Sequence, residues 1–166
     1  MMRSMIVALT ALLVVLASAQ EDIWTESVLP DGSALYGCGA FCEPEELSCV
    51  RQILPDSKEM TVRGVITSNI WQEVDAAFVA EAAEQFPHFQ IYGGQRVGAP
   101  GIADFGGEEL LVAYYSMSTM DDADVASTVL MWPTKPGLEM LRCTTYVTED
   151  ADGLLQGLVL KLLGDN

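Results

Sequence analysis

Three carboxylates surround a pair of glycines near the middle of the chain. Asp104, Glu108 and Glu109 stand on either side of positions 106–107. Two carboxyl groups held across a bond, at about 5 Å or about 6.5–9.5 Å, can act as acid, base or nucleophile in hydrolysis. These three residues are therefore the catalytic candidates for a small carboxylate-dependent hydrolase. Because the chain has 24 acidic residues, a cluster of this kind is also expected by chance.

Arg96 is the one cation in the glycine-rich stretch 93–107. A guanidinium beside backbone N–H groups can bind a carboxylate or a phosphate, which makes Arg96 a candidate ligand-binding residue. The stretch contains neither the G-x-G-x-x-G fingerprint nor a glycine followed by Lys and Ser or Thr, so it predicts no nucleotide and no other cofactor. A flexible surface loop with a solvated arginine is the simpler interpretation.

The chain has four cysteines, Cys38, Cys42, Cys49 and Cys143. An even number of cysteines in an exported protein is typical of disulfides, and four would form two. Three pairings are possible, and each one connects Cys143 to the cluster of three upstream. A zinc site is the rival interpretation, but the first two ligands would have C-x3-C spacing, which differs from the usual C-x2-C pairs.

Two acidic segments have oxygen ligands that calcium could use. The segment 121–124 lacks the glycine and the distal glutamate of an EF-hand loop. Asp150 and Asp152 precede a glycine at alternating positions, but Val159 stands where the EF-hand glutamate would be. A hairpin turn over 149–153 explains this second segment better, so no metal site is predicted and Asp150 and Asp152 remain weak candidates.

The single histidine, His88, lies beside Pro87 with no nucleophile motif around it. The chain has no G-x-S-x-G, no H-E-x-x-H and no C-x-x-C. One imidazole cannot form a multi-histidine metal site, and a base without a nucleophile and an orienting acid does not form a triad. The sequence therefore favours a non-enzymatic protein, without deciding the question.

The first 19 residues have the three parts of a secretory signal peptide. Arg3 precedes an apolar run over residues 5–16, and small residues follow at 17–19. We expect cleavage before Gln20 and export to the periplasm or the extracellular space. An uncleaved membrane anchor is less favoured, because a spanning helix needs about 20 apolar residues.

The chain is strongly acidic, with a formal net charge of −16. Arg3 leaves with the leader, so the remaining chain is more negative still. Such a charge repels nucleic acid and anionic membranes, and we expect neither as a partner once the leader is removed. An unknown protein or a small-molecule ligand remains the expected partner.

The stretch 60–94 is expected to be the unit on which the rest packs. It predicts a strand over 61–67, a helix over 69–85 and a strand over 89–92. Trp71, Val74 and Phe78 lie at helical spacing and form an apolar stripe, and Pro87 disfavours helix at the preceding residue. Four aromatic residues could line a pocket between helix and sheet, although plain core positions are the simpler interpretation: Trp71, Tyr114, Tyr115 and Trp132.

The remaining segments are expected to be a helix and several strands. Residues 20–35 are weakly patterned, with a turn at 30–32, and residues 43–54 predict a short helix. Strands are expected over 110–118, 125–132 and 138–148, with a short helix as the alternative for 125–132. The last segment, 154–163, predicts a strand, with a helix as the alternative.

Together these patterns predict an α+β fold in which one long helix packs on a curved, mainly antiparallel sheet, with a short disulfide-tied helical segment at the N-terminus. We expect a signal peptide over 1–19, a cysteine-containing arm over 20–59 and a core over 60–166, the arm and core forming one domain. The function predicted is an exported binding or interaction module of unknown ligand, with the hydrolase as the alternative.

Overall fold

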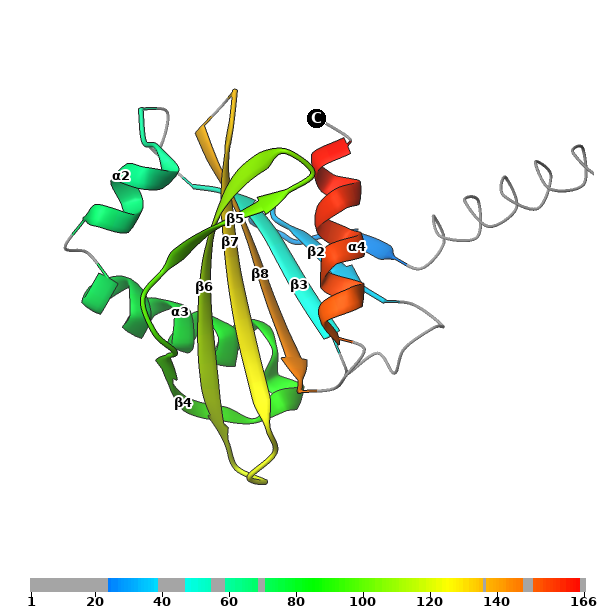
Figure 1. Cartoon of the computed structure of the whole chain (residues 1–166). Coiled ribbons are helices and arrows are strands. Elements are labelled where there is room, and N and C mark those ends of the chain that lie inside the picture. The colour runs from blue at the N-terminus through cyan, green and yellow to red at the C-terminus, as the bar shows by residue number, and fades with distance from the viewer. Residues whose placement is uncertain are drawn as a thin grey trace, which may run out of the picture.

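The computed structural model of the chain describes residues 24–38, 47–54, 59–68, 71–135, 137–147 and 151–164. An eight-stranded antiparallel sheet dominates the fold, with α2 and α3 on one side and α4 on the other (Figure 1). The elements follow in the order β1 (Thr25–Val28), β2 (Ala34–Gly37), β3 (Leu47–Ile53), α2 (Val62–Thr67), α3 (Trp71–Gln85), a 3-10 turn η2 (Pro87–Phe89), β4 (Ile91–Arg96), β5 (Gly101–Phe105), β6 (Glu108–Thr119), β7 (Val125–Thr134), β8 (Gly137–Tyr146) and α4 (Ala151–Gly164).

The predicted fold class is wrong. The strands lie in the order β1-β2-β3-β8-β7-β6-β4, and β5 pairs with β6 as well. The sheet is thus the main element, and helices of 15 and 14 residues, α3 and α4, cover its opposite faces in place of one long helix. The first three strands extend the same sheet, so the N-terminal segment is not a helical satellite.

Side chains alternate along the central strands and form a core on each face of the sheet. On β6, Leu111 and Ala113 pack in the core that contains Phe78 of α3. Leu110 and Val112 pack in the core that contains Leu158 of α4. Burial on both faces of β6 agrees with the apolar residues at consecutive positions that predicted an interior strand.

Several segments adopt a different structure from the predicted one. Helix α4 begins at Ala151, inside the stretch 149–153 where a hairpin turn was expected, and Phe89 ends a 3-10 turn where a strand was expected to begin. Residues 47–53 form β3 and not a helix, and residues 62–67 form α2 and not a strand. The final segment forms α4 and not a strand, with Leu158, Val159 and Leu162 buried at helical spacing. By contrast, the helix expected to end before Phe86 and the strands expected over 110–118, 125–132 and 138–148 are confirmed.

The glycine-rich stretch is a sheet edge and not a loop. β5 pairs with the first part of β6 and β4 with its last part, so the two short strands lie one after the other along the same edge. Gly94 lets α3 lie close to this edge, because a Cβ atom there would lie 3.2 Å from the Val79 Cγ2 of α3, and it would also lie 2.7 Å from the Met117 Sδ of β6. Glycine at this position therefore allows α3 to pack directly on β4.

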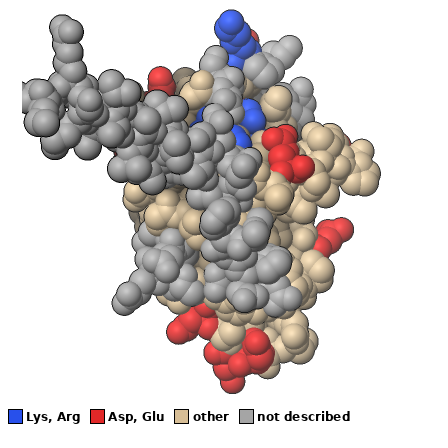
Figure 2. Space-filling view, turned by 90° about the vertical axis from the view of Figure 1, so that its right-hand side faces the viewer, with Lys and Arg blue, Asp and Glu red and all other residues tan. Residues whose placement is uncertain are grey.

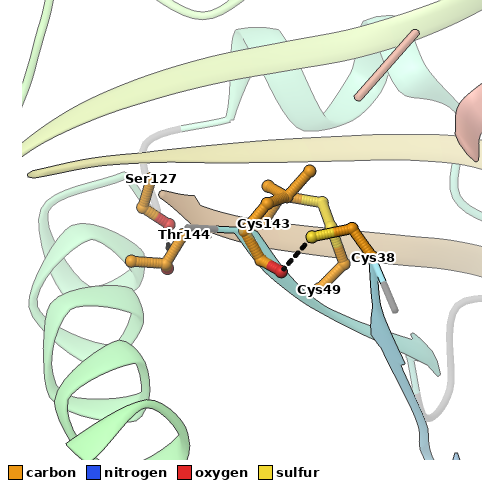
Figure 3. Close-up of a disulfide and its surroundings, with 6 residues drawn as sticks. Cys38, Cys49, Ser127, Cys143 and Thr144 are labelled. Atoms are coloured by element: carbon orange, nitrogen blue, oxygen red, sulfur yellow. Dashed lines mark hydrogen bonds between the residues drawn. A yellow bond between two sulfur atoms is a disulfide. The ribbon is translucent and has the colours of Figure 1, made fainter. Parts of the chain in front are cut away.

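A disulfide joins Cys49 of β3 to Cys143 of β8, at directly opposed positions of the two strands (Figure 3). The sequence left three pairings open, and this bond selects the one in which Cys143 is tied to Cys49. Both residues are buried in the core under α4. Cys38 is also disulfide-bonded, and Cys42 lies outside the described residues.

Candidate functional site

An apolar cavity lies between α2, α3 and the sheet. Its volume is about 170 Å³. It is lined by Leu54, Met60, Val65, Trp71, Val74, Ala77, Phe78 and Met131. None of these residues is charged or has a polar group other than the Trp71 indole N–H, so the cavity is suited to a neutral apolar group.

The short helix α2 forms one wall because its ends are fixed by local hydrogen bonds. Thr61 caps its N-terminus, with the Oγ1 accepting from the Gly64 N–H at 3.1 Å. The Val65 carbonyl near its C-terminus accepts from the Trp71 indole N–H at 3.1 Å. This last bond joins the start of α3 to α2, satisfies the indole and holds the ring as a wall of the cavity.

Arg96 lies over the ring of Trp71, with its Cζ 5.2 Å from the ring centroid. Its Nε donates to the Asp75 Oδ1 at 2.9 Å, and a terminal nitrogen donates to the Gly98 carbonyl at 2.7 Å. The residue predicted as an anion ligand therefore uses these donors inside the protein. Recognition of a carboxylate or phosphate by Arg96 stays a prediction.

Arg142 lies over Phe78, the second aromatic residue that lines the cavity, in the same way as Arg96 lies over Trp71. Its Cζ lies 5.1 Å from the centroid of Phe78, and its side chain is 1% exposed. It donates to the Gln85 Oε1 at 2.8 Å and to a carboxylate oxygen of Glu81. Burial lowers the pKa of the Arg142 guanidinium, and the Glu81 charge opposes that shift.

Asp75 of α3 bonds to two strands of the sheet, through Arg96 of β4 and Tyr115 of β6. Its Oδ1 accepts from the Tyr115 hydroxyl at 2.9 Å as well as from Arg96. Burial, together with the Asp75 charge, raises the pKa of Tyr115 above its ordinary value. The Tyr115 ring also meets Phe78 edge to face, with centroids 5.9 Å apart. Hydrogen bonds and ring contacts thus connect the two aromatic walls behind the cavity.

The three predicted catalytic carboxylates do not point to one place. Asp104 and Glu109 are cross-strand partners on β5 and β6, whereas Glu108 is opposite Phe105 and its side chain lies on the other face of the sheet. The Asp104 Oδ1 accepts from the Gly107 N–H at 3.1 Å, and Glu109 pairs with Arg63. All three are exposed. The Asp104 side chain thus stabilises the β5–β6 turn, and Glu109 belongs to a surface ion pair.

The calcium candidates are placed only in part. In the β6–β7 turn, hydrogen bonds from Thr119 and the Ala123 N–H lower the pKa of Asp121. Asp150 and the side chain of Asp152 lie outside the described residues. Among the residues that the structure does describe, no three His, Cys, Asp or Glu side chains gather as metal ligands.

Of the four aromatic residues that were predicted either to line a pocket or to fill the core, some lie in each place. Trp71 lines the cavity, whereas Tyr115 and Trp132 are core residues on opposite faces of the sheet. Tyr114 is 56% exposed and belongs to neither. The lone histidine, His88, is exposed and contacts the ring of Phe89, with centroids 4.2 Å apart.

Sequence reasoning did not find the cavity as such. Its lining comes from five separate segments, and only the α3 stripe was visible as a pattern. The sequence did not indicate that Met60, Val65 and Met131 line a cavity, because α2 was predicted as a strand and the register of β7 was unknown.

Acidic side chains greatly outnumber basic ones in this protein, with 24 Asp and Glu residues against 8 Lys and Arg residues. In the part of the chain that the structure describes, each arginine pairs with a carboxylate: Arg51 with Glu139, Arg63 with Glu109, Arg96 with Asp75 and Arg142 with Glu81. In the view of Figure 2, acidic side chains appear in separate groups near the top, at one edge and at the bottom, and basic side chains appear near the top. None of the helices within the described ranges has the length and apolar character needed to cross a membrane.

Comparisons with known proteins give a weak likeness of fold. No protein-family model matches the chain, and no curated protein matches it. A solution structure of cyanobacterial PsbP (CyanoP) from Synechocystis sp. PCC 6803 aligns at 14% identity and a TM-score of 0.47, covering 80% of this chain and 75% of that one. A protein of unknown function from Pseudomonas aeruginosa, PA94, aligns at 13% identity and a TM-score of 0.31, covering 74% and 83%. At these values neither likeness carries an argument about function.

Proposed function

We propose that the chain is an exported binding module and that the apolar cavity beneath α2 and α3 holds a small neutral ligand. The observation that carries this proposal is the lining. Eight apolar residues from both helices and the sheet surround about 170 Å³ of space. A cavity of roughly 150 Å³ with a similar lining is large enough to bind benzene.

The character of the lining restricts the ligand. Trp71 and Phe78 contribute aromatic faces, and Met60 and Met131 contribute thioethers that contact aromatic rings favourably. A charged ligand would lose its hydration without gaining a partner from these residues. A single neutral ring is therefore the class of ligand that the cavity suits.

Export follows from the predicted leader and agrees with the Cys49–Cys143 disulfide, since such bonds persist in oxidising compartments. Mass spectrometry of the unreduced protein from the medium or periplasm would test this part. We expect a chain beginning at Gln20. A chain that retains residues 1–19 would contradict it.

A hydrolase is the weaker proposal. It requires two convergent carboxylates. Asp104 and Glu109 are cross-strand partners, but the Gly107 N–H and Arg63 already engage them, and Glu108 lies on the opposite face of the sheet. Unchanged turnover in alanine variants of all three residues, against a broad panel of esters and glycosides, would remove it.

Titration calorimetry with toluene tests the binding site. Ala77 lines the cavity and is exposed, so Ala77→Phe should occupy its mouth. Ala76 is also exposed but does not line the cavity, which makes Ala76→Phe the matched control. We expect a dissociation constant on the order of 0.1–1 mM for the unchanged protein.

The two variants should separate clearly. Ala77→Phe should weaken toluene binding at least about tenfold, and Ala76→Phe should leave it within about twofold. Absence of toluene binding to the unchanged protein, or equal binding to the two variants, would overturn the assignment of this cavity as a binding site.

A further inference from the structure

The apolar cavity is closed at the sheet and reaches solvent at its other end. Met131 of β7 is the lining residue that a strand contributes, and it is 3% exposed. Its cross-strand partners, Leu111 and Met140, are buried too. By contrast, Met60 is 42% exposed and Ala77 is exposed, although both line the cavity. The cavity therefore has a floor at Met131 and a mouth at Met60 and Ala77.

Buried contacts hold the walls between this floor and this mouth. The Trp71 indole N–H donates to the Val65 carbonyl at 3.1 Å, and all of Val65, Trp71 and Phe78 are buried. The Phe78 ring also meets Tyr115 edge to face, with centroids 5.9 Å apart. Side chains packed in this way leave little freedom for the cavity to widen. A ligand is therefore expected to lie along the line from the mouth to the floor.

The volume of the cavity leaves room for one aromatic ring and little else. It is about 170 Å³, and a cavity of roughly 150 Å³ is large enough for benzene. A long substituent on a bound ring therefore has to leave the cavity, and the mouth is where the lining residues reach solvent. A second substituent at the opposite end of the ring would meet Met131, which has buried neighbours on both sides.

We propose that the cavity binds the phenyl end of a longer small molecule, with the ring directed toward Met131 and its one substituent leaving past Met60 and Ala77. This inference rests on the proposed function, since it names the ligand class of the same cavity. Met131 limits how deeply the ring enters and determines specificity. The far end of the substituent stays in water, so a polar group there loses no hydration.

Two isomeric alcohols test this orientation. In 4-phenylbutan-1-ol the ring has one long substituent, whereas in 2-(4-ethylphenyl)ethanol two short substituents stand at opposite ends of the ring. Because the two molecules have the same formula and the same functional group, a difference in affinity reports on shape. Titration calorimetry should show 4-phenylbutan-1-ol binding at least about fivefold more tightly than its isomer. It should also bind within about threefold of toluene, because the same ring is buried in both cases.

Met131→Ala lowers the floor and should bring the affinity ratio of the two isomers closer to one. Met117→Ala is the matched control, because it removes the same side chain from the same core, but Met117 does not line the cavity. It should leave the ratio unchanged. A ratio that neither variant changes would overturn the role of Met131.

The outcomes separate the two proposals. If toluene and both alcohols fail to bind, the binding site itself is wrong, and this inference falls with it. If toluene binds but the two isomers bind equally, the orientation is wrong and the binding site stands. The same holds if 4-phenylbutan-1-ol binds more than about tenfold more weakly than toluene, because its hydroxyl is then buried among apolar residues. These measurements use the unchanged protein, so they decide the question even if Met131→Ala does not fold.

Discussion

Cys49 and Cys143 lie directly opposite each other on β3 and β8 and are joined by a disulfide across 94 residues of sequence. The bond closes a loop that contains α2, α3 and most of the sheet. In the chain-entropy model, a loop of this length gives about 4–5 kcal/mol of stability, because it restricts the unfolded chain.

The double variant Cys49→Ala, Cys143→Ala should therefore lose about 4–5 kcal/mol in the free energy of unfolding. Urea titration followed by tryptophan fluorescence would measure it, with the Cys38 disulfide left in place. A loss below about 1 kcal/mol would show that the bond adds little to this fold.

Gly94→Ala should destabilise the protein by crowding β4 against both α3 and β6. The new Cβ would lie 3.2 Å from the Val79 Cγ2 of α3, and 2.7 Å from the Met117 Sδ and 3.0 Å from the Ser116 carbonyl oxygen of β6. Overpacking of this kind costs about 1–3 kcal/mol. Gly93→Ala is the matched control, since the nearest atom to its Cβ is 4.0 Å away. Thermal unfolding that gives equal losses for the two variants would contradict the close packing around Gly94.

Glu81→Ala should cost more stability than Arg142→Met. Loss of the carboxylate leaves a cation whose side chain is 1% exposed without its charge partner, and such losses cost about 3–5 kcal/mol. Replacement of the arginine by methionine removes the buried charge, and Glu81 can be hydrated because its side chain is 44% exposed. Urea unfolding should show this order, and the reverse order would mean that Arg142 stabilises the fold mainly through its contact with Phe78.

The raised pKa of Tyr115 predicts that the protein loses stability at alkaline pH. Burial and the bond to Asp75 raise its pKa in the folded protein above the ordinary value of 10.0. Above pH 10 the unfolded chain therefore releases a proton that the folded chain keeps, so the free energy of unfolding falls as the pH rises.

Removal of the titrating hydroxyl should reduce that fall. Between pH 10 and pH 11, Tyr115→Phe should lose stability less steeply than the unchanged protein, by at most about 1.4 kcal/mol per pH unit. Tyr36, whose pKa burial also raises, contributes in the same direction in both proteins. Tyr114→Phe, at the exposed neighbouring position, is the control. Equal slopes for all three proteins would contradict the account of Tyr115.

The sequence predicted the central strands better than the segments around them. In β6, apolar residues at consecutive positions such as Leu110 and Leu111 indicated burial on both faces, and the structure places them in separate cores. In β3, Leu47 and Val50 also suit a helical stripe, and only the pairing with β8 decides for a strand. The spacing of apolar residues along the chain does not show which strands pair with each other.

Local capping and packing decided two further segments. Residues 61–67 are rich in β-branched residues and predicted a strand, but the Thr61 cap and the burial of Val62 and Val65 stabilise a helix. The final segment has leucines at positions that satisfy both periods, and its packing on the sheet decides for a helix. The cavity depends on α2, so the error over 61–67 concealed the candidate site.

Methionine methyl NMR tests the binding proposal most directly. With 13C-labelled methionine methyl groups, Met60 and Met131 report on the cavity, and Met120, which is 74% exposed on the β6–β7 turn, is the internal control. Toluene should shift the Met60 and Met131 signals along one saturable curve and leave the Met120 signal unchanged. No saturable shift at Met60 and Met131, or an equal shift at Met120, would contradict the assignment of the cavity as a ligand site.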